Sequence, residues 1–382
     1  MLALALSVAL LNVQDPPRQR TICKNGTVIL VERMADEPAI SIQLWASAQS
    51  VPETKSTHGF RHLLEHLAAR GSGDLDSRLE QQGCYMTART FRDAMQIEVN
   101  VGPRQLDLGI SALLEVIKPL QTSQASIDRE VGVLRQEFAT YDDASKLSSA
   151  GWIGAYGDFG LDPFGNLETL SKATPDVLRE LHRKHFYPEN LAIVISGPVD
   201  IKAASEKAVA SFGIKQGGIR VLGEPLPPGK SGRVEVEGFG EGRSAITPGY
   251  DHPRTVGALS FALAVASGMK GAFVTYTPSV ARGLVTVGQT ERTSGMGLRI
   301  DAIGDDEWPR LFAVGKILAR RWIDLYLRSA SGVAYLRGLL LCQNPAARPE
   351  LMLEAVDVLT FGQFKEAATL FSKEKGVTVV GA

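Results

Sequence analysis

Residues 59–66 bring together side chains that can bind a metal ion and activate a water molecule. His62 and His66 lie four positions apart, with Glu65 directly before His66. On a helix, residues four apart lie on one face, so both imidazoles can bind a single tetrahedral zinc ion. Glu65 lies next to that face, within reach of a water on the metal. A chance pairing on an amphipathic helix is the alternative, but the chain has only six histidines. The pattern predicts a zinc site, provided that a third ligand exists.

A helix expected over 123–141 offers two candidates for the third ligand. Its apolar residues form a continuous stripe: Ile127, Val131, Leu134, Phe138 and Tyr141. Glu130 and Glu137 flank the stripe and are nearly two turns apart, so they project in almost the same direction. Two glutamates on a helix are most often solvated, but at the edge of a core either one could bind zinc. A set of two histidines and a glutamate leaves a fourth position for water, which is typical of catalytic zinc.

Composition excludes several other classes of function. The chain has 382 residues, 44% of them hydrophobic and 22% charged, which is ordinary for a globular protein of two or three domains. A net charge of −1 gives no support for nucleic acid or acidic lipid as a partner. No segment is long and apolar enough to predict a stable membrane span. The three cysteines, which are odd in number and far apart, are expected to be buried thiols.

The first residues resemble an export signal. Residues 2–11 are almost entirely apolar and too short to span a bilayer. Residues 1–14 are therefore interpreted as a signal peptide, which predicts a periplasmic or secreted protein. The alternative is a buried N-terminal strand in a cytoplasmic protein.

Periodicity predicts the elements that position the motif in the first half, 15–222. Two short β-rich runs around a turn at Asn25-Gly26 predict a hairpin over 21–33. Further strands are expected at 39–48, in 84–101 as an antiparallel pair, and at 191–196. Helices are expected over 104–118 and 175–185, whereas 142–165, with four glycines in its first 19 residues, is expected to be loop-rich. His182 and His185, three apart, are interpreted as surface or core residues and not as a second metal site.

A linker divides the chain. Residues 223–233 are rich in glycine and proline and carry no hydrophobic periodicity. Beyond them, in 234–382, strand-like and helical segments alternate again, and the second half repeats the element types of the first without its metal residues. The expected fold class is α+β, with two similar domains.

The metal-binding motif and the segments around it resemble the M16 family of zinc metallopeptidases, which includes pitrilysin and the mitochondrial processing peptidases. The family motif Gly-x-x-His-x-x-Glu-His, an inverted zinc-protease motif of the inverzincin type, is matched by residues 59–66. The glutamate that follows in the family is matched by Glu137, and an acidic residue seven positions before it is matched by Glu130. Residues 87–90 with Asp93, the loop 162–165 and the block 186–190 also resemble family segments.

The resemblance implies roles for these residues. His62, His66 and Glu137 would bind Zn²⁺, and Glu65 would act as general base. Glu130 would support catalysis by orienting a histidine or tuning a ligand. An edge-strand segment and an arginine of the second half would bind the substrate backbone: Thr87, Ala88, Arg89, Thr90 and Arg282.

The resemblance also implies a fold and an activity. Each domain would be an antiparallel-rich sheet with helices on one side, as in M16 and LuxS-like metallohydrolases. The chain would be a zinc-dependent endopeptidase that hydrolyses short or unfolded peptides, and it would form a homo- or heterodimer with another M16-like subunit. Thr286 stands where the family has a substrate-binding tyrosine, which favours a partner that supplies this group. The alternative is a non-catalytic or partner-dependent subunit with a scaffold role, and another kind of zinc hydrolase is a third interpretation.

Overall fold

The computed structural model describes residues 18–49, 52–71, 73–214, 226–238, 240–290 and 299–381. The predicted signal peptide at 1–14 lies outside these residues, as do the first three positions of the predicted linker. Within the described ranges, no helix has the length and apolar character needed to cross a membrane.

The first half of the chain forms a six-stranded sheet. Its strands pair in the order β1-β2-β6-β3-β5-β4, and only β2 and β6 are parallel. The predicted hairpin is β1 and β2, and the predicted antiparallel pair in 84–101 is β4 and β5, with β4 at the sheet edge. The strand bounds are Arg18–Ile22 (β1), Val28–Arg33 (β2), Ile40–Ser47 (β3), Tyr85–Thr90 (β4), Ala94–Val101 (β5) and Leu191–Gly197 (β6).

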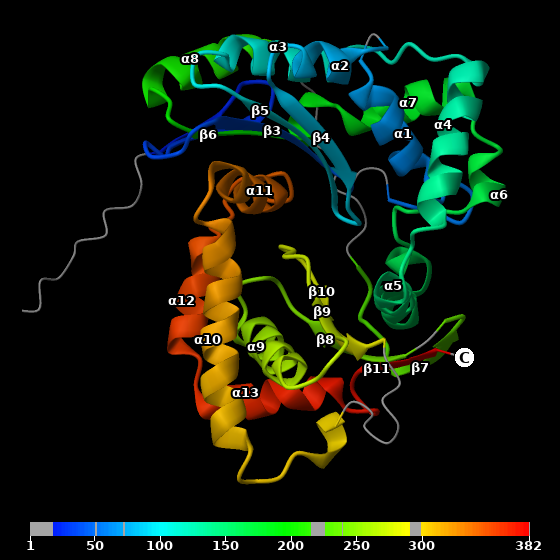
Figure 1. The fold of residues 1–382 in the computed structure, drawn as a ribbon, viewed down its shortest axis with the longest axis vertical. Coiled ribbons are helices and arrows are strands. Elements are labelled where there is room, and N and C mark those ends of the chain that lie inside the picture. Colours follow the sequence, from blue (N-terminus) through cyan, green and yellow to red (C-terminus); the bar gives the residue numbers. More distant parts are fainter. Residues whose placement is uncertain are drawn as a thin grey trace, which may run out of the picture.

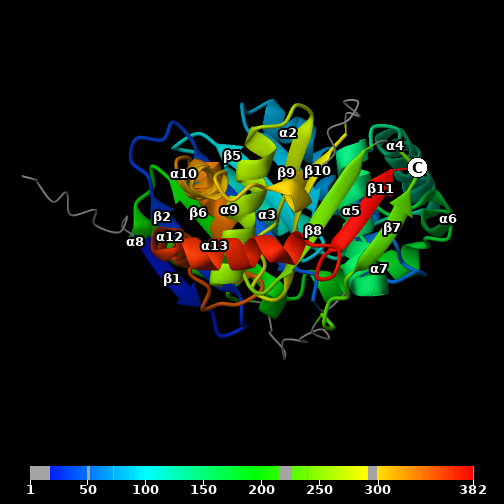
Figure 2. The same cartoon turned by 90° about the horizontal axis from the view of Figure 1, so that it is seen from below.

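The second half forms a five-stranded sheet with the same pairing scheme (Figure 2). The order β7-β11-β8-β10-β9 reproduces β2-β6-β3-β5-β4, including the single parallel pair at one end. This agreement confirms the expected α+β fold of two similar halves. The strand bounds are Gly232–Val236 (β7), Glu241–Thr247 (β8), Ala272–Thr275 (β9), Gly283–Gln289 (β10) and Val377–Gly381 (β11).

Helices cover both sheets (Figure 1). The first half contains Phe60–Ala69 (α1), Leu75–Glu80 (α2), Leu106–Val116 (α3), Gln124–Phe138 (α4), Asp143–Tyr156 (α5), Leu167–Leu170 (α6), Pro175–His185 (α7) and Ile201–Phe212 (α8). The second half contains Pro253–Ser267 (α9), Trp308–Tyr326 (α10), Ala330–Leu341 (α11), Glu350–Val358 (α12) and Phe361–Ala368 (α13). Short 3₁₀ turns occupy Gly157–Gly160, Pro188–Asn190, Arg299–Ala302 and Thr369–Phe371.

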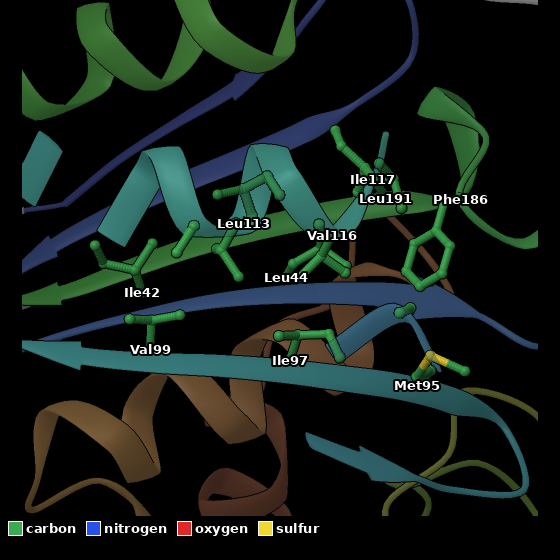
Figure 3. Close-up of a cluster of buried hydrophobic side chains, with 14 of the residues drawn as sticks. Ile42, Leu44, Met95, Ile97, Val99, Leu113, Val116, Ile117, Phe186 and Leu191 are labelled. Carbon is green, nitrogen blue, oxygen red and sulfur yellow. The ribbon is translucent and has the colours of Figure 1, made fainter. Parts of the chain in front are cut away.

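The main core lies between the first sheet and its outer helices. Alternate residues of β3 and β5 point to this side and pack on α3 and on the end of α7 (Figure 3). The labelled side chains include Ile42, Leu44, Ile97, Leu113 and Phe186, most of them without measurable exposure. Burial of apolar side chains on this scale holds the helices in place and so positions the motif helix α1.

Each sheet is also covered on its second face, by one helix from the opposite half. The helix α11 packs on β3, β5 and β6, and α5 packs on β7, β8, β10 and β11 (Figure 1). The expected arrangement had helices on one side of each sheet. In the structure, a helix covers the second side as well. Both α5 and α11 have a glycine where the helix lies closest to its sheet. A Cβ at Gly151 in α5 would lie 2.5 Å from Ser244 Oγ, and one at Gly338 in α11 would lie 2.1 Å from Trp45 Cδ1.

The helix α5 corrects the expectation of a loop over 142–165. Asp142 caps it by accepting a hydrogen bond from the backbone N–H of Ser145, at 2.7 Å. Its glycines suggested a loop, since glycine disfavours helices in isolation. In the structure Gly151 and Gly154 face the second sheet closely, so packing against β-strands outweighs the low helix propensity. The remainder of the segment, after α5, is 3₁₀ turn and loop.

We expect Gly338→Ala to destabilise the protein by about 1–3 kcal/mol, because the new methyl group would overlap the fully buried Trp45. Gly132→Ala is the matched control. Gly132 also lies inside a helix, but apart from its chain neighbours and the backbone of its own helix no described atom comes within 4 Å of its Cβ position, so alanine should be neutral or stabilise by up to ~1 kcal/mol. Urea unfolding of both variants measures the difference. Equal stabilities would show that α11 does not pack on the sheet at this distance.

Candidate metal centre

The helix α1 carries His62, Glu65 and His66, and it packs against α4. It begins after Gly59, whose φ of 91° is a left-handed conformation that favours glycine. A Cβ at this position would also lie 2.8 Å from Gly165 Cα. The rings of His62 and His66 are 5.0 Å apart between centroids, as expected for side chains one turn apart.

Glu137 reaches both histidines from α4. One carboxylate oxygen lies 3.4 Å from His62 Nε2 and the other lies 3.5 Å from His66 Nε2. Ligand atoms that are 2.0–2.2 Å from a tetrahedral zinc ion lie about 3.3–3.6 Å from one another, so these separations fit the metal. In the part of the chain that the structure describes, this is the one group of His, Cys, Asp and Glu side chains close enough to hold a metal ion.

The other nitrogen of each ring is occupied by the protein. His62 Nδ1 lies 3.4 Å from the carbonyl oxygen of Phe164, and His66 Nδ1 lies 3.5 Å from Glu130 Oε2. Such partners hold a ring with Nε2 directed at the metal. Burial, and then the charge of His66, lower the pKa of His62 to about 4, so the ring stays neutral, which is the form that binds metals.

Glu130 lies behind His66 and not in the space in front of the ligands. Its side chain is 1% exposed, and Arg70 Nε lies 2.7 Å from its Oε1. This geometry corresponds to the supporting role that the sequence predicted for Glu130. Arg70 was missed, although its position four residues after His66 on the same helical face was a usable signal.

Glu65 is almost fully buried, at 7% exposure. The hydroxyl of Thr90, at the end of β4, donates a hydrogen bond of 3.1 Å to Glu65 Oε2. Burial, with a smaller contribution from the charge of Glu137, raises the pKa of Glu65 to about 8 in the metal-free protein. A cation close to this carboxylate favours its ionised form, in which it can act as a base.

We expect Glu65→Gln to stabilise the metal-free protein at pH 8. The pKa of Glu65 is raised by folding from its usual 4.5, so the native state is increasingly disfavoured as the pH rises from 4.5 through about 8, by roughly 1.4 kcal/mol for each pH unit between these values. Glutamine does not titrate. Thermal unfolding in the presence of a chelator should therefore show a stabler variant at pH 8 and no difference near pH 4. If the wild type were as stable as Glu65→Gln at pH 8, the burial of Glu65 would be contradicted.

A cavity of about 530 Å³ opens in front of these groups and is called the site cavity below. Its walls come from α1, the end of β4, the loop 162–164, α5 and Thr275 of β9. Of the predicted substrate-binding residues, Ala88, Arg89 and Thr90 line it, whereas Thr87 and Arg282 are not among its lining residues.

The loop 162–165 supports the site in a way that the sequence did not predict. Asp162 accepts hydrogen bonds from the hydroxyls of Tyr141 and Ser149 and from the backbone N–H of Phe164. Burial alone would raise the pKa of Asp162, but His58, whose Nε2 lies 3.4 Å from Oδ1, and the hydrogen bond from Ser149 hold it well below its usual range. An ionised Asp162 therefore shapes the turn that presents the Phe164 carbonyl to His62. Resemblance to a family loop identified the segment but not this role.

The remaining histidines and cysteines of interest are structural. His182 Nε2 lies 3.1 Å from the carbonyl oxygen of Val116, and both His182 and His185 are buried. The cysteines Cys23, Cys84 and Cys342 are buried. These placements confirm the predictions of core histidines and buried thiols.

Comparisons with known proteins show which family the chain is similar to. Residues 28–155, which include every proposed ligand and the proposed base, match the model of the insulinase family, peptidase family M16. The chain is 27% identical over 232 residues to an uncharacterized zinc protease of Streptomyces coelicolor, covering 58% of this chain and 50% of that protein. It is 25% identical over 279 residues to the mitochondrial-processing peptidase subunit beta of Blastocladiella emersonii, covering 69% and 58% respectively.

A solved structure extends the likeness to the whole chain. A protease from Helicobacter pylori superimposes with a TM-score of 0.80 at 16% identity, covering 95% of this chain and 99% of that chain. At this identity the likeness shows the two-domain fold alone. The chain spans about half the length of the curated relatives that it matches.

Proposed function

We propose, from the match of residues 28–155 to the model of peptidase family M16, that the protein is a zinc-dependent endopeptidase of short or unfolded peptides. One observation carries the proposal. The ligand atoms of His62, His66 and Glu137 lie within 4.8 Å of one another, and Glu65 lines the same cavity. A non-catalytic scaffold would not need both a complete ligand set and a base beside it.

The residues of the chain divide the work of hydrolysis. His62, His66 and Glu137 would hold Zn²⁺, which when bound supplies a Lewis acid and lowers the pKa of water to about 7. Glu65 accepts the proton of the attacking water and passes it to the leaving amine. Thr90 holds Oε2 of Glu65 by its hydrogen bond, which leaves Oε1 for this proton transfer.

The edge strand β4 explains why unfolded peptides are the proposed substrates. It pairs with β5 on one side and is the last strand of its sheet among the described residues. An extended peptide can add to such an edge through backbone hydrogen bonds, with little dependence on its sequence. Because Ala88 and Thr90 line the site cavity, a peptide on this edge would pass in front of Glu65.

The proposal is tested with one peptide sequence presented in two forms. We expect an unstructured peptide to be cut at internal bonds, as mapped by mass spectrometry, and the same sequence inside a stable folded domain to resist. A chelator should abolish cutting and added zinc should restore it. Cutting that persists after complete removal of metal would refute the proposal.

We also propose that a second M16-like subunit completes the substrate site. Thr286, in the position of the family tyrosine, is fully buried, and its hydroxyl lies 2.8 Å from Ser244 Oγ. Arg282 is exposed and lies outside the lining of the site cavity. The groups expected to hold substrate from the second half are thus displaced from the site. Light scattering after size exclusion measures the assembly, and a monomer with full activity would contradict this proposal.

A non-catalytic subunit is the second candidate function. The buried Thr286 favours it, because the chain then lacks one substrate-binding group of its family. Stoichiometric zinc without hydrolysis of any unstructured peptide, alone or with a partner, would support this alternative.

A further inference from the structure

Arg92 enters the site cavity from the turn that follows β4. It lines this cavity and also a neighbouring cavity of about 460 Å³, so the side chain lies on the boundary between the two. Its guanidinium carbon lies 4.2 Å from the centre of the Trp152 ring, which belongs to α5. A guanidinium stacked on an indole keeps its edge free for in-plane hydrogen bonds.

The position of Arg92 is held firmly. The buried Arg61, which is paired with Glu53 at 3.0 Å, donates hydrogen bonds to the carbonyl oxygens of Phe91 and Arg92. Arg92 Nε donates to the carbonyl oxygen of Gly160, at 3.3 Å. The turn and the side chain are therefore ordered before any ligand arrives, which reduces the entropic cost of binding.

Arg92 is partly exposed and differs from the buried arginines of the described residues. Arg61, Arg243 and Arg337 each form an ion pair with a carboxylate. Arg92 has none among the described residues, and its hydrogen bond to Gly160 uses one of five N–H donors. No Arg92 nitrogen is among the buried polar atoms without a partner in the described residues, so its remaining N–H groups are open to a ligand that enters the cavity.

Two acidic groups lie near Arg92 without pairing with it. Asp162 accepts hydrogen bonds from the hydroxyls of Tyr141 and Ser149, and Asp93 adds a second negative charge close to the guanidinium. Neither lies within ion-pair distance of Arg92 in the described structure. Their charges moderate the field of the guanidinium without using its free N–H groups.

The charge of the whole cavity also favours an anion. Arg89 lines it as a second arginine, is exposed, and has no ion pair within the described ranges. With Zn²⁺ bound, the four positive charges of the metal, Arg89 and Arg92 exceed the three negative charges of Glu65, Glu137 and Asp162. An anionic group on the peptide would therefore be attracted into the cavity.

We propose that Arg92 forms a carboxylate subsite, which selects peptides that carry a carboxylate close to the cleaved bond. The carboxylate is either an Asp or Glu side chain or the free C-terminus, since both present the same two oxygens to a guanidinium edge. This inference rests on the proposed function, because it assigns a substrate class to the same site.

The test uses quenched fluorescent peptides that differ by one group. One series exchanges Glu for Gln at each position around the cleaved bond, and a second exchanges a free C-terminus for an amide. We expect wild type to prefer the carboxylate member of one series by about 10- to 100-fold in kcat/KM. This is the ratio that corresponds to the net contribution of a hydrogen bond to a charged group. The series that shows the preference identifies the source of the carboxylate.

Variants connect that preference to Arg92. Arg92→Gln should reduce the ratio to near one, and Arg92→Lys, which keeps the charge and the packing on Trp152, should give an intermediate ratio. Arg104→Gln, at an exposed arginine away from the cavity, should keep the wild-type ratio. Thermal unfolding checks that the Arg92 variants are folded. An equal loss on carboxylate and neutral peptides in the folded variants would overturn the proposal.

A binding measurement separates this inference from the proposed function. Fluorescence anisotropy of the same peptides is measured on zinc-loaded Glu65→Gln protein, with and without Arg92→Gln. An Arg92-dependent preference in binding, without hydrolysis by wild type either alone or with a second M16-like subunit, would support the subsite and refute the peptidase. No preference in binding or in hydrolysis would refute the subsite, whether or not wild type cuts peptides.

Discussion

Glu65→Gln should reduce kcat/KM for peptide hydrolysis by about 10²–10⁴-fold, while one zinc ion per chain is retained. Glutamine has the same shape and can keep the hydrogen bond with Thr90, but it cannot accept a proton from water. Glu65 is not part of the group His62, His66 and Glu137 that can hold a metal ion, so its replacement should leave these three ligands in place. Initial rates on an unstructured peptide, measured beside metal content, give both quantities from one preparation.

Glu80→Gln provides the control for this substitution. Glu80 is exposed at the end of α2 and does not line the site cavity, so its loss of charge should leave both zinc and activity unchanged. Comparable hydrolysis by Glu65→Gln and wild type would remove Glu65 as the base. A loss of zinc in Glu65→Gln would instead show that the carboxylate is part of the metal site.

Glu137→Gln should remove stoichiometric zinc and, with it, the activity. Its carboxylate lies 3.4 and 3.5 Å from the two Nε2 atoms, so it is the third donor of the set. A neutral amide is a much poorer ligand for zinc than a carboxylate, and two histidines alone do not complete a catalytic site. Metal content after dialysis against zinc-free buffer, and calorimetric titration with zinc, measure the change.

Glu130→Gln distinguishes the ligand from its support. Because Glu130 is buried behind His66 and is paired with Arg70, its replacement should weaken zinc binding by about 10- to 100-fold without abolishing it. The two glutamates are seven residues apart on one helix, so they form a matched pair. If Glu130→Gln lost zinc and Glu137→Gln retained it, the assignment of the third ligand would be reversed.

The histidine spacing was predictable because it depends on helix geometry alone. Residues four apart on a helix must share a face, so His62 and His66 could be paired without knowledge of the fold. The choice between Glu130 and Glu137 as the third ligand could not be made from helix geometry alone. Both project from α4 in nearly the same direction, and which one meets His62 and His66 depends on how α4 packs on α1. Resemblance to a family favoured Glu137, and the structure brings its carboxylate to both rings.

The helix α5 shows what local patterns could not reveal. Gly151 and Gly154 lower its helix propensity, and only the strands of the opposite sheet explain why they are tolerated. The same limit applies to Arg92 and to Asp162. Their partners Trp152, Gly160, Tyr141 and Ser149 are far from β4 or from the motif in sequence, and no periodicity connects them.

Titration of the metal-free protein with zinc, with hydrolysis of an unstructured peptide followed at each step, tests whether His62, His66 and Glu137 hold a catalytic zinc ion. We expect no hydrolysis without metal and a rate that rises in proportion to bound zinc until one ion per chain is reached, because His62, His66 and Glu137 form one metal-binding group within the described residues. Full hydrolysis at zero zinc would contradict this function, and so would one bound zinc per chain with no hydrolysis either alone or with a second M16-like subunit.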